Sequence, residues 1–226
     1  MTTGPWRAGA TGSTLGAPVS IVRAAPRRLW RTAFGKIVPV SASLAGSVAL
    51  TFDDGPDPVW TPAVLAALRG SPLRATFFVI APRAVEHPEL VAAARAAGHA
   101  VELHCYDHVR HTELARADVE RDTERALEAL ADLGVRPTRW RPPYGVEAEW
   151  TREVADGFGL RLCGWDLDTN DWRGHAAEHM LAEVGPGLRP GAVVLLHDGV
   201  GPESLRDGCE ETVRFAQLLA AEAVAA

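Results

Sequence analysis

From residue 47 to the end of the chain, apolar segments typical of β-strands alternate with segments that have helical spacing or helix-end signals. The strand-like segments are 47–52, 73–80, 99–104, 138–141, 160–168 and 192–197. The helix-like segments begin at Thr61-Pro62, open at Pro88, extend over 113–133, and lie near 147–156, 175–184 and 209–224. Strands that alternate with helices indicate βαβ units and a mostly parallel sheet. We therefore expect an α/β fold in a single domain.

The length and the N-terminal composition set the domain boundaries. The chain has 226 residues, of which 47% are hydrophobic, so one large domain can bury a sizeable core. Residues 1–45 contain no unbroken apolar run that is long enough for a signal peptide or a membrane span. We expect 1–45 to be an N-terminal arm and peripheral segment, 46–226 to be the functional domain, and the location to be cytoplasmic, with another export route left open.

Charge and cysteine content exclude two classes of protein. Lys and Arg number 23 against 29 Asp and Glu, which gives a net charge of −6 and argues against a non-specific nucleic-acid binder. The three cysteines are scattered and form no CxxC pair, so we expect no disulfide framework and a reduced compartment.

Polar residues stand where the predicted strands end. They are Asp53 and Asp54 after the first strand, His104 at the third, Arg141 at the fourth, Asp168 at the fifth and His197 at the sixth. The carboxyl ends of the strands in an α/β barrel converge on one face, and active sites are built there. These residues are therefore expected to meet in one cleft.

The acidic pair and the nearby histidines have the composition of a metal site. Taken alone, DDG is more often a solvated acidic turn, and an isolated H-x-x-x-H is more often a surface or capping pair. If the chain turns helical after the third strand, His104 and His108 project to one side. Two imidazoles and one carboxylate supply the three protein ligands of a catalytic zinc site, and the second carboxylate remains free to accept a proton from an activated water. His111 is a weaker candidate ligand.

Two aromatic and proline-containing segments follow. WRPPYG (140–145) reads either as a rigid surface loop or as an arginine that orients a carboxylate, with a stiff turn that aims a backbone N–H at an oxyanion. WDLDTNDW (165–172) reads either as a loop with aromatic anchors or as an aspartate that holds a histidine beside a tryptophan that lines a sugar-sized pocket.

The sixth strand ends in a histidine. His197 is either a satisfied structural residue or, if an aspartate raises its pKa, a general acid for a leaving group. The neighbouring Asp198 and the earlier Asp57 are expected to have structural roles within their turns.

The segments TFDDG, H-x-x-x-H, RPPYG, DTNDW and LLH occur in this order. As an ordered set, over about residues 46 to 220, they make the chain similar to the polysaccharide deacetylase family, the NodB-homology domain of carbohydrate esterase family 4. The resemblance implies a distorted, incomplete (β/α) barrel in 46–226. It also implies a metal-dependent hydrolase that removes N-acetyl, or O-acetyl, groups from a carbohydrate.

The resemblance further implies roles for individual residues. Asp53 is expected to be the general base, oriented by Arg141. The metal, most often zinc with cobalt or nickel as alternatives, is expected on Asp54, His104 and His108.

The remaining expected roles concern the oxyanion and the leaving group. The backbone N–H of Tyr144 is expected to stabilise the oxyanion, and Asp171 to tune His197, the general acid. Trp172 and Leu195 are expected to line the pocket for the acetyl methyl group.

Two departures and three alternatives remain at this stage. Cys105 stands where the family commonly has Ser or Thr, which weakens a hydrogen-bond donor and makes the site oxidisable if the thiol is accessible. The secretion signal of wall-acting members is not seen. The substrate is an acetylated sugar, either a polymer or a small N-acetyl sugar or natural product. A non-catalytic carbohydrate-binding relative and a phosphoesterase are further alternatives. The oligomeric state is left open.

Overall fold

The computed structural model describes residues 48–225, and the predicted N-terminal arm lies outside the described residues. Within that described part, no helix is long and apolar enough to span a bilayer.

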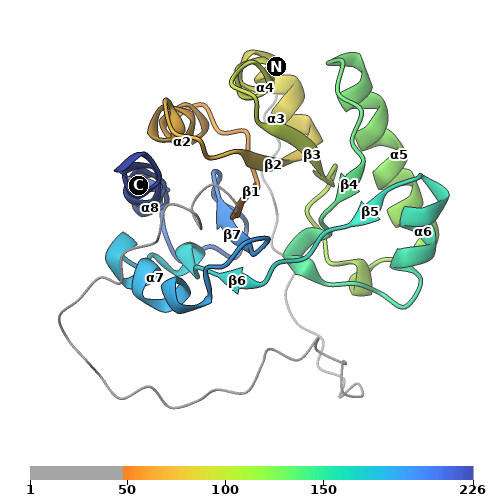
Figure 1. The fold of residues 1–226 in the computed structure, drawn as a ribbon. Helices are drawn as coiled ribbons and strands as arrows, with labels where there is room; N and C mark the ends of the chain where they lie inside the picture. The colour runs from red at the N-terminus through yellow and green to blue at the C-terminus, as the bar shows by residue number, and fades with distance from the viewer. Residues whose placement is uncertain (1–47, 226) are drawn as a thin grey trace. The chain divides into compact units, whose positions relative to one another are not determined.

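A single parallel sheet of seven strands forms the centre of the described domain. The strands are β1 (Ala49–Asp53), β2 (Ala75–Ile80), β3 (Ala100–Cys105), β4 (Arg139–Trp140), β5 (Arg161–Leu162), β6 (Leu167–Asp168) and β7 (Val193–His197). Their order across the sheet is β5-β4-β3-β2-β1-β7-β6, and every neighbouring pair is parallel. Figure 1 shows the sheet curled into an open half-barrel. The predicted incomplete (β/α) barrel is confirmed.

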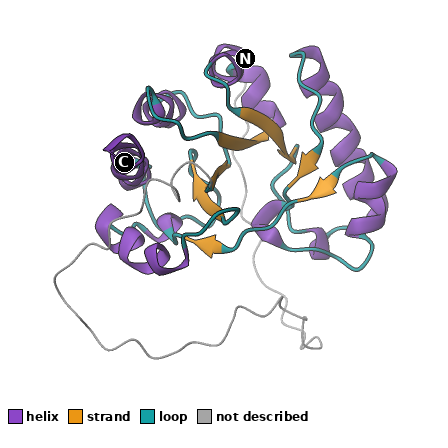
Figure 2. Ribbon diagram, in the orientation of Figure 1, coloured by secondary structure: helices purple, strands orange, loops and turns teal. Residues whose placement is uncertain are grey.

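Helices lie along the outside of the curled sheet (Figure 2). They are α2 (Trp60–Leu68), α3 (Ala81–Glu86), α4 (Pro88–Ala96), α5 (Arg116–Asp132), α6 (Thr151–Gly157), α7 (Ala177–Val184) and α8 (Glu210–Ala225). Short 3₁₀ turns are η1 (His111–Glu113), η2 (Pro143–Gly145), η3 (Asp171–Arg173) and η4 (Gly185–Gly187). The short helix α3 was not predicted, because APRAVE follows β2 directly and Pro82 in its first turn is its one helix-start signal.

The segment 160–168, predicted as one strand, is two. β5 pairs with β4 and β6 pairs with β7, at opposite edges of the sheet. Residues 163–166 lead from one edge strand to the other across the opening of the half-barrel (Figure 1). A continuous strand could not serve both edges, because neighbouring strands must lie about 4.8 Å apart to pair.

The central strands bring chemically active positions into register. Asp53, the last residue of β1, pairs with Phe78 of β2 on one side and with His197 of β7 on the other. Because all three strands run the same way, their carboxyl ends lie at one edge of the sheet. This edge carries the residues described in the next section.

Burial of the apolar helix faces and of the strands forms the core. In α5 the buried positions are Val119, Thr123, Ala126 and Leu130, spaced three or four apart, as expected for one face of a helix. Leu130 is fully buried, whereas Glu128 on the same helix is exposed.

Replacing Leu130 with Ala is expected to lower the free energy of unfolding by about 2–5 kcal/mol, because the truncation leaves a cavity in a packed core. Replacing the exposed Glu128 with Ala is the matched control and should change it by less than about 0.5 kcal/mol. Urea unfolding followed by circular dichroism measures both. Equal effects of the two substitutions would contradict the packing described for α5.

Candidate active site

A pocket of about 330 Å³ opens where the carboxyl ends of the strands meet. Eight of the predicted site residues line it: Asp53, Asp54, His104, His108, Tyr144, Trp172, Leu195 and His197. The other two, Arg141 and Asp171, are fully buried and bond to residues of that lining. The structure therefore brings these ten residues together, from segments spread over almost the whole domain.

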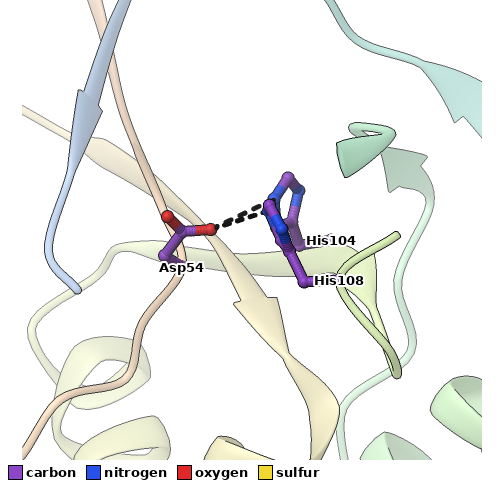
Figure 3. A group of neighbouring side chains, drawn as sticks. All are labelled: Asp54, His104 and His108. Atoms are coloured by element: carbon purple, nitrogen blue, oxygen red, sulfur yellow. Dashed lines mark hydrogen bonds and ion pairs between the residues drawn. The ribbon is translucent and has the colours of Figure 1, made fainter. Parts of the chain in front are cut away.

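Asp54, His104 and His108 form a compact triangle of ligand atoms (Figure 3). Oδ1 of Asp54 lies 3.3 Å from Nε2 of His104 and 3.2 Å from Nε2 of His108. The two Nε2 atoms are 3.1 Å apart. At metal–ligand bond lengths of about 2.0–2.1 Å, a tetrahedral ion separates its ligand atoms by about 3.3 Å. The three side chains thus fit one divalent ion.

Two further observations support this fit. The Nδ1 atom of His104 bonds to the carbonyl oxygen of Arg141 at 2.7 Å. Because a carbonyl can only accept, Nδ1 donates, and Nε2 of the neutral ring keeps its lone pair for a metal. Oδ1 of Asp54 is buried and has no hydrogen-bond partner among the described residues, which a cation would remedy.

The backbone around Asp54 is shaped to hold its carboxylate in place. Asp54 has a φ of 70°, in the left-handed region that non-glycine residues rarely adopt. Arg83 donates from Nη1 to its carbonyl oxygen at 2.6 Å. The chain also passes so close at Gly199 that a Cβ there would lie 2.7 Å from that same carbonyl oxygen. Burial raises the pKa of Asp54, but His104 and His108 outweigh it and hold the pKa well below its usual value.

Asp53 is bonded to a buried guanidinium. Nη1 of Arg141 donates to Oδ1 of Asp53 and to Oγ1 of Thr51, each at 2.8 Å. Nε and Nη2 of Arg141 donate to the carbonyl oxygens of Cys163 and Gly164, at 3.1 and 2.9 Å. A buried charge is tolerated when it is both paired and hydrogen-bonded, and Arg141 meets both conditions.

His197 is paired with a second buried carboxylate. Its Nδ1 bonds to Oδ1 of Asp171 at 2.8 Å, and its backbone N–H donates to Oδ2 of Asp171 at 2.9 Å. Because a carboxylate accepts, Nδ1 donates, and Nε2 is the ring atom left to exchange a proton. Burial lowers the pKa of His197, but the charge of Asp171 and their hydrogen bond outweigh it and raise the pKa to about 9.

Several residues that support this site were not predicted from the sequence. Arg206 donates from Nη1 to Oδ2 of Asp171 at 3.1 Å and from Nη2 to the carbonyl oxygen of His197 at 3.1 Å. Arg110 and Glu203 line the pocket and form a two-pronged ion pair. These residues lie in loops with no recognisable pattern, so their positions follow only from the folded chain.

Two possibilities raised by the spacing of the histidines are not realised. The segment after His104 is not helical: residues 106–110 form no helix, and His108 reaches the site from an irregular loop. His111 takes no part in the metal triangle. Its Nδ1 lies 3.1 Å from Oγ1 of Thr151, and its ring centroid is 5.0 Å from that of Trp140. Spacing alone did not distinguish a side chain aimed at the cleft from one packed into the core.

The remaining residues singled out in the sequence occupy supporting positions. Cys105 is buried, and burial raises the pKa of its thiol well above the usual value, so the condition for ready oxidation is not met. Oδ1 of Asp57 accepts the N–H groups of Val59 and Trp60 at the start of α2. Asp198 accepts from Oγ1 of Thr61 at 2.5 Å, and Asp168 lines the pocket.

Comparison with known proteins agrees with this geometry. Residues 42–163 match the family model described as polysaccharide deacetylase. A chitooligosaccharide deacetylase of Sinorhizobium fredii is 38% identical over 174 residues, which cover 75% of this chain and 80% of that protein. A peptidoglycan-N-acetylglucosamine deacetylase of Listeria monocytogenes is 38% identical over 152 residues, or 67% of this chain and 32% of that protein.

A solved structure shows the same fold. The family 4 carbohydrate esterase from Streptomyces lividans in complex with acetate superposes with a TM-score of 0.70 and 34% sequence identity, over 80% of this chain and 88% of that one. The family match extends over more than half of the chain, and the Sinorhizobium relative is more than 30% identical over more than two thirds of both chains. The chain therefore belongs to the polysaccharide deacetylase family.

Proposed function

We propose that this chain is a metal-dependent deacetylase that hydrolyses the acetamide of an N-acetylated carbohydrate. The observation that carries the proposal is the triangle of Asp54, His104 and His108, with Asp53 beside it in the same pocket. Three protein ligands leave a tetrahedral ion one open position, which is the pattern of a catalytic rather than a structural zinc site.

The cofactor is proposed to be one divalent ion, with zinc first and cobalt or nickel as alternatives. When bound, such an ion lowers the pKa of a water molecule and polarises a carbonyl oxygen. Imidazole nitrogen suits all three metals, and the small ligand triangle fits a tetrahedral ion, so the donor set disfavours Mg²⁺ and Ca²⁺.

Asp53 is the proposed general base. Its Oδ1 is held by Arg141, which fixes the orientation of the carboxylate in the pocket that the metal triangle also lines. From that position it accepts the proton of the water that attacks the acetyl carbonyl carbon. The backbone N–H of Tyr144 is proposed to donate to the oxyanion that then forms.

His197 is the proposed general acid. With a pKa raised to about 9 it carries a proton at neutral pH, as the donor to an amine leaving group must. Asp171 fixes the ring so that Nε2 is the proton donor. Trp172 and Leu195 complete the wall of the pocket and are proposed to contact the acetyl methyl group.

The substrate proposed for the first test is a chitooligosaccharide, because the Sinorhizobium relative carries that name. The pocket of about 330 Å³ is at the small end of ligand pockets, which suits one sugar residue of a longer chain or a small N-acetyl sugar. A non-catalytic carbohydrate-binding role is the second candidate, and acetate release distinguishes the two.

Replacing Asp53 with Asn is expected to lower acetate release from chitooligosaccharides by at least about 100-fold while zinc content stays at the wild-type level. Replacing His104 with Ala should abolish both activity and bound zinc, because a ligand is removed. Asp57→Asn is the matched control, since an amide oxygen can still accept the N–H groups that Asp57 caps. An active Asp53→Asn enzyme would disprove the assignment of the base.

Replacing Asp171 with Asn is expected to bring the pKa of His197 down from about 9 to its ordinary value or below. A histidine whose pKa is raised in the folded state stabilises the fold fully below pH about 6.5, and this stabilisation is lost as the pH rises toward 9. The difference in unfolding free energy between wild type and variant should therefore shrink over this window.

Imidazole NMR titration and urea unfolding of EDTA-treated protein measure the two effects. Glu178→Gln, which changes an exposed carboxylate on α7, is the control and should leave the titration of His197 unchanged. A titration midpoint that Asp171→Asn does not move would contradict the pairing.

A further inference from the structure

We propose that His175, His179 and Glu183 form a second site for a transition-metal ion, at the start of α7 and separate from the catalytic pocket. His175 stands in the turn before α7, and the other two follow at intervals of four residues along the helix. His179 and Glu183, four apart on the helix, lie on one face, and the loop before the helix brings a ligand atom of His175 close to theirs. None of them lines the pocket.

The distances favour a shared cation over simple ion pairs. Nδ1 of His175 lies 3.7 Å from Oε2 of Glu183, and Nε2 of His179 lies 3.6 Å from Oε1 of the same carboxylate. These separations are longer than hydrogen bonds, but only a few tenths of an ångström above the spacing of ligands around a tetrahedral ion. The potential ligand atoms all lie within 4.8 Å of one another.

The placement of the two imidazoles points the same way. Nδ1 of His175 is buried and has no hydrogen-bond partner among the described residues. The centroids of the two rings lie 4.7 Å apart, so both can offer a nitrogen to one ion. Two imidazoles with one carboxylate favour Zn²⁺, Ni²⁺ or Cu²⁺ over Mg²⁺ or Ca²⁺.

The position of this site in the chain means that metal binding would affect the structure next to the catalytic pocket. Only Gly174 separates His175 from η3, which carries Asp171 and Trp172. An ion that joins His175 to α7 fixes the end of this catalytic segment to a helix. Bound metal is therefore expected to stabilise the folded chain by linkage, whether or not the chain is catalytically active.

Zinc titration by calorimetry tests the site. Wild type is expected to bind two Zn²⁺ per chain, and His104→Ala/His108→Ala, which removes the catalytic ligands, one. Adding His179→Ala to that double variant should abolish the remaining binding and the zinc-dependent rise in melting temperature. Adding Glu178→Gln is the matched control, because Glu178 lies on the same helix but pairs with Arg214, and binding should persist.

Several results would overturn the second site. One is that wild type binds a single equivalent of zinc and that His179→Ala does not change this number. Another is that the triple variants with His179→Ala and with Glu178→Gln bind zinc equally. A third is that Mg²⁺ binds and raises the melting temperature as much as Zn²⁺ does. The comparison of zinc stoichiometry between wild type and the single variant His179→Ala tests the site even if the double variant does not fold.

A different set of contacts supports a second inference: we infer that Arg110 and Glu203 are positioning residues for Tyr144. This inference rests on the proposed function, because it concerns the backbone N–H proposed as an oxyanion donor. Tyr144 has a φ of 59° and a ψ of 7°, a left-handed conformation that is unfavourable for a tyrosine and needs support from its surroundings.

The ring of Tyr144 supplies that support. The guanidinium carbon of Arg110 lies 3.6 Å from the centre of the ring, and the ring of His108 meets it edge-on with centroids 4.6 Å apart. Arg110 is held in turn by Glu203, with Nη1 and Nη2 donating to its two carboxylate oxygens at 2.7 and 2.5 Å. The loops after β3 and β7 are thus clamped together over the turn that holds Tyr144.

Fluorine NMR tests the clamp without turnover. The chain has only two tyrosines, Tyr106 and Tyr144, so 3-fluorotyrosine gives two signals. Tyr106 lies under its own guanidinium, that of Arg125 at 3.7 Å, and serves as the internal control. Glu203→Gln should shift or broaden the Tyr144 signal alone. An unchanged Tyr144 signal, or equal changes in both signals, would overturn the clamp.

Kinetics test the consequence for catalysis. Glu203→Gln and Arg110→Ala should lower kcat about 3- to 10-fold, with KM changed less than about twofold and zinc content unchanged. Arg110→Lys keeps the cation over the ring and should recover part of the loss. Glu153→Gln removes a comparable exposed pair with Arg116 and should behave as wild type. A rise in KM at unchanged kcat would overturn the positioning role.

The two measurements separate this inference from the proposed function. If wild type releases no acetate from any acetylated sugar, the proposed function fails and the positioning role fails with it. The fluorine signals then still test whether Arg110 and Glu203 hold the ring of Tyr144 in place.

Discussion

The buried side chain and backbone of Arg141 connect the proposed catalytic base, a metal-binding histidine and the chain segment at the opening of the sheet. Its side chain pairs with Asp53, while its own carbonyl oxygen fixes the ring of His104. Two more of its donors bond to the carbonyl oxygens of Cys163 and Gly164, in the stretch of chain that leads from one edge of the open sheet to the other. One residue thus orients the proposed base, selects the ligand atom of a metal histidine and anchors the opening of the half-barrel.

This arrangement explains how two adjacent carboxylates take different environments. Asp53 ends β1 and meets a permanent cation, whereas Asp54 turns into the left-handed region and meets two imidazoles. A third carboxylate, Asp171, is buried beneath His197 and stabilised by Arg206. Because each acidic group has its own cationic or imidazole partner, charges of one sign can share a small pocket.

Much of the fold and of the site could be predicted from local pattern. The apolar run before Asp53 and the alternation of β3 specified strands, and a parallel sheet necessarily brings strand ends to one edge. That reasoning predicted that Asp53 and His197 share one cleft, and the register of β1 with β7 pairs them directly. It failed at 160–168, where strand-like alternation hides a change of partner strand. It also left His111 as a weaker candidate ligand, although the ring of His111 packs against Trp140.

The sequence by itself therefore determined the α/β class, the ends of the central strands and the identity of the residues gathered there. These properties depend on short-range periodicity and on residue chemistry, which are legible along the chain. The tertiary structure alone decided that Arg206 supports Asp171, that Arg110 and Glu203 meet over Tyr144, and that the half-barrel stays open between β5 and β6. Such contacts join loops many residues apart, and their partners are set by how the sheet curls, which no local pattern encodes.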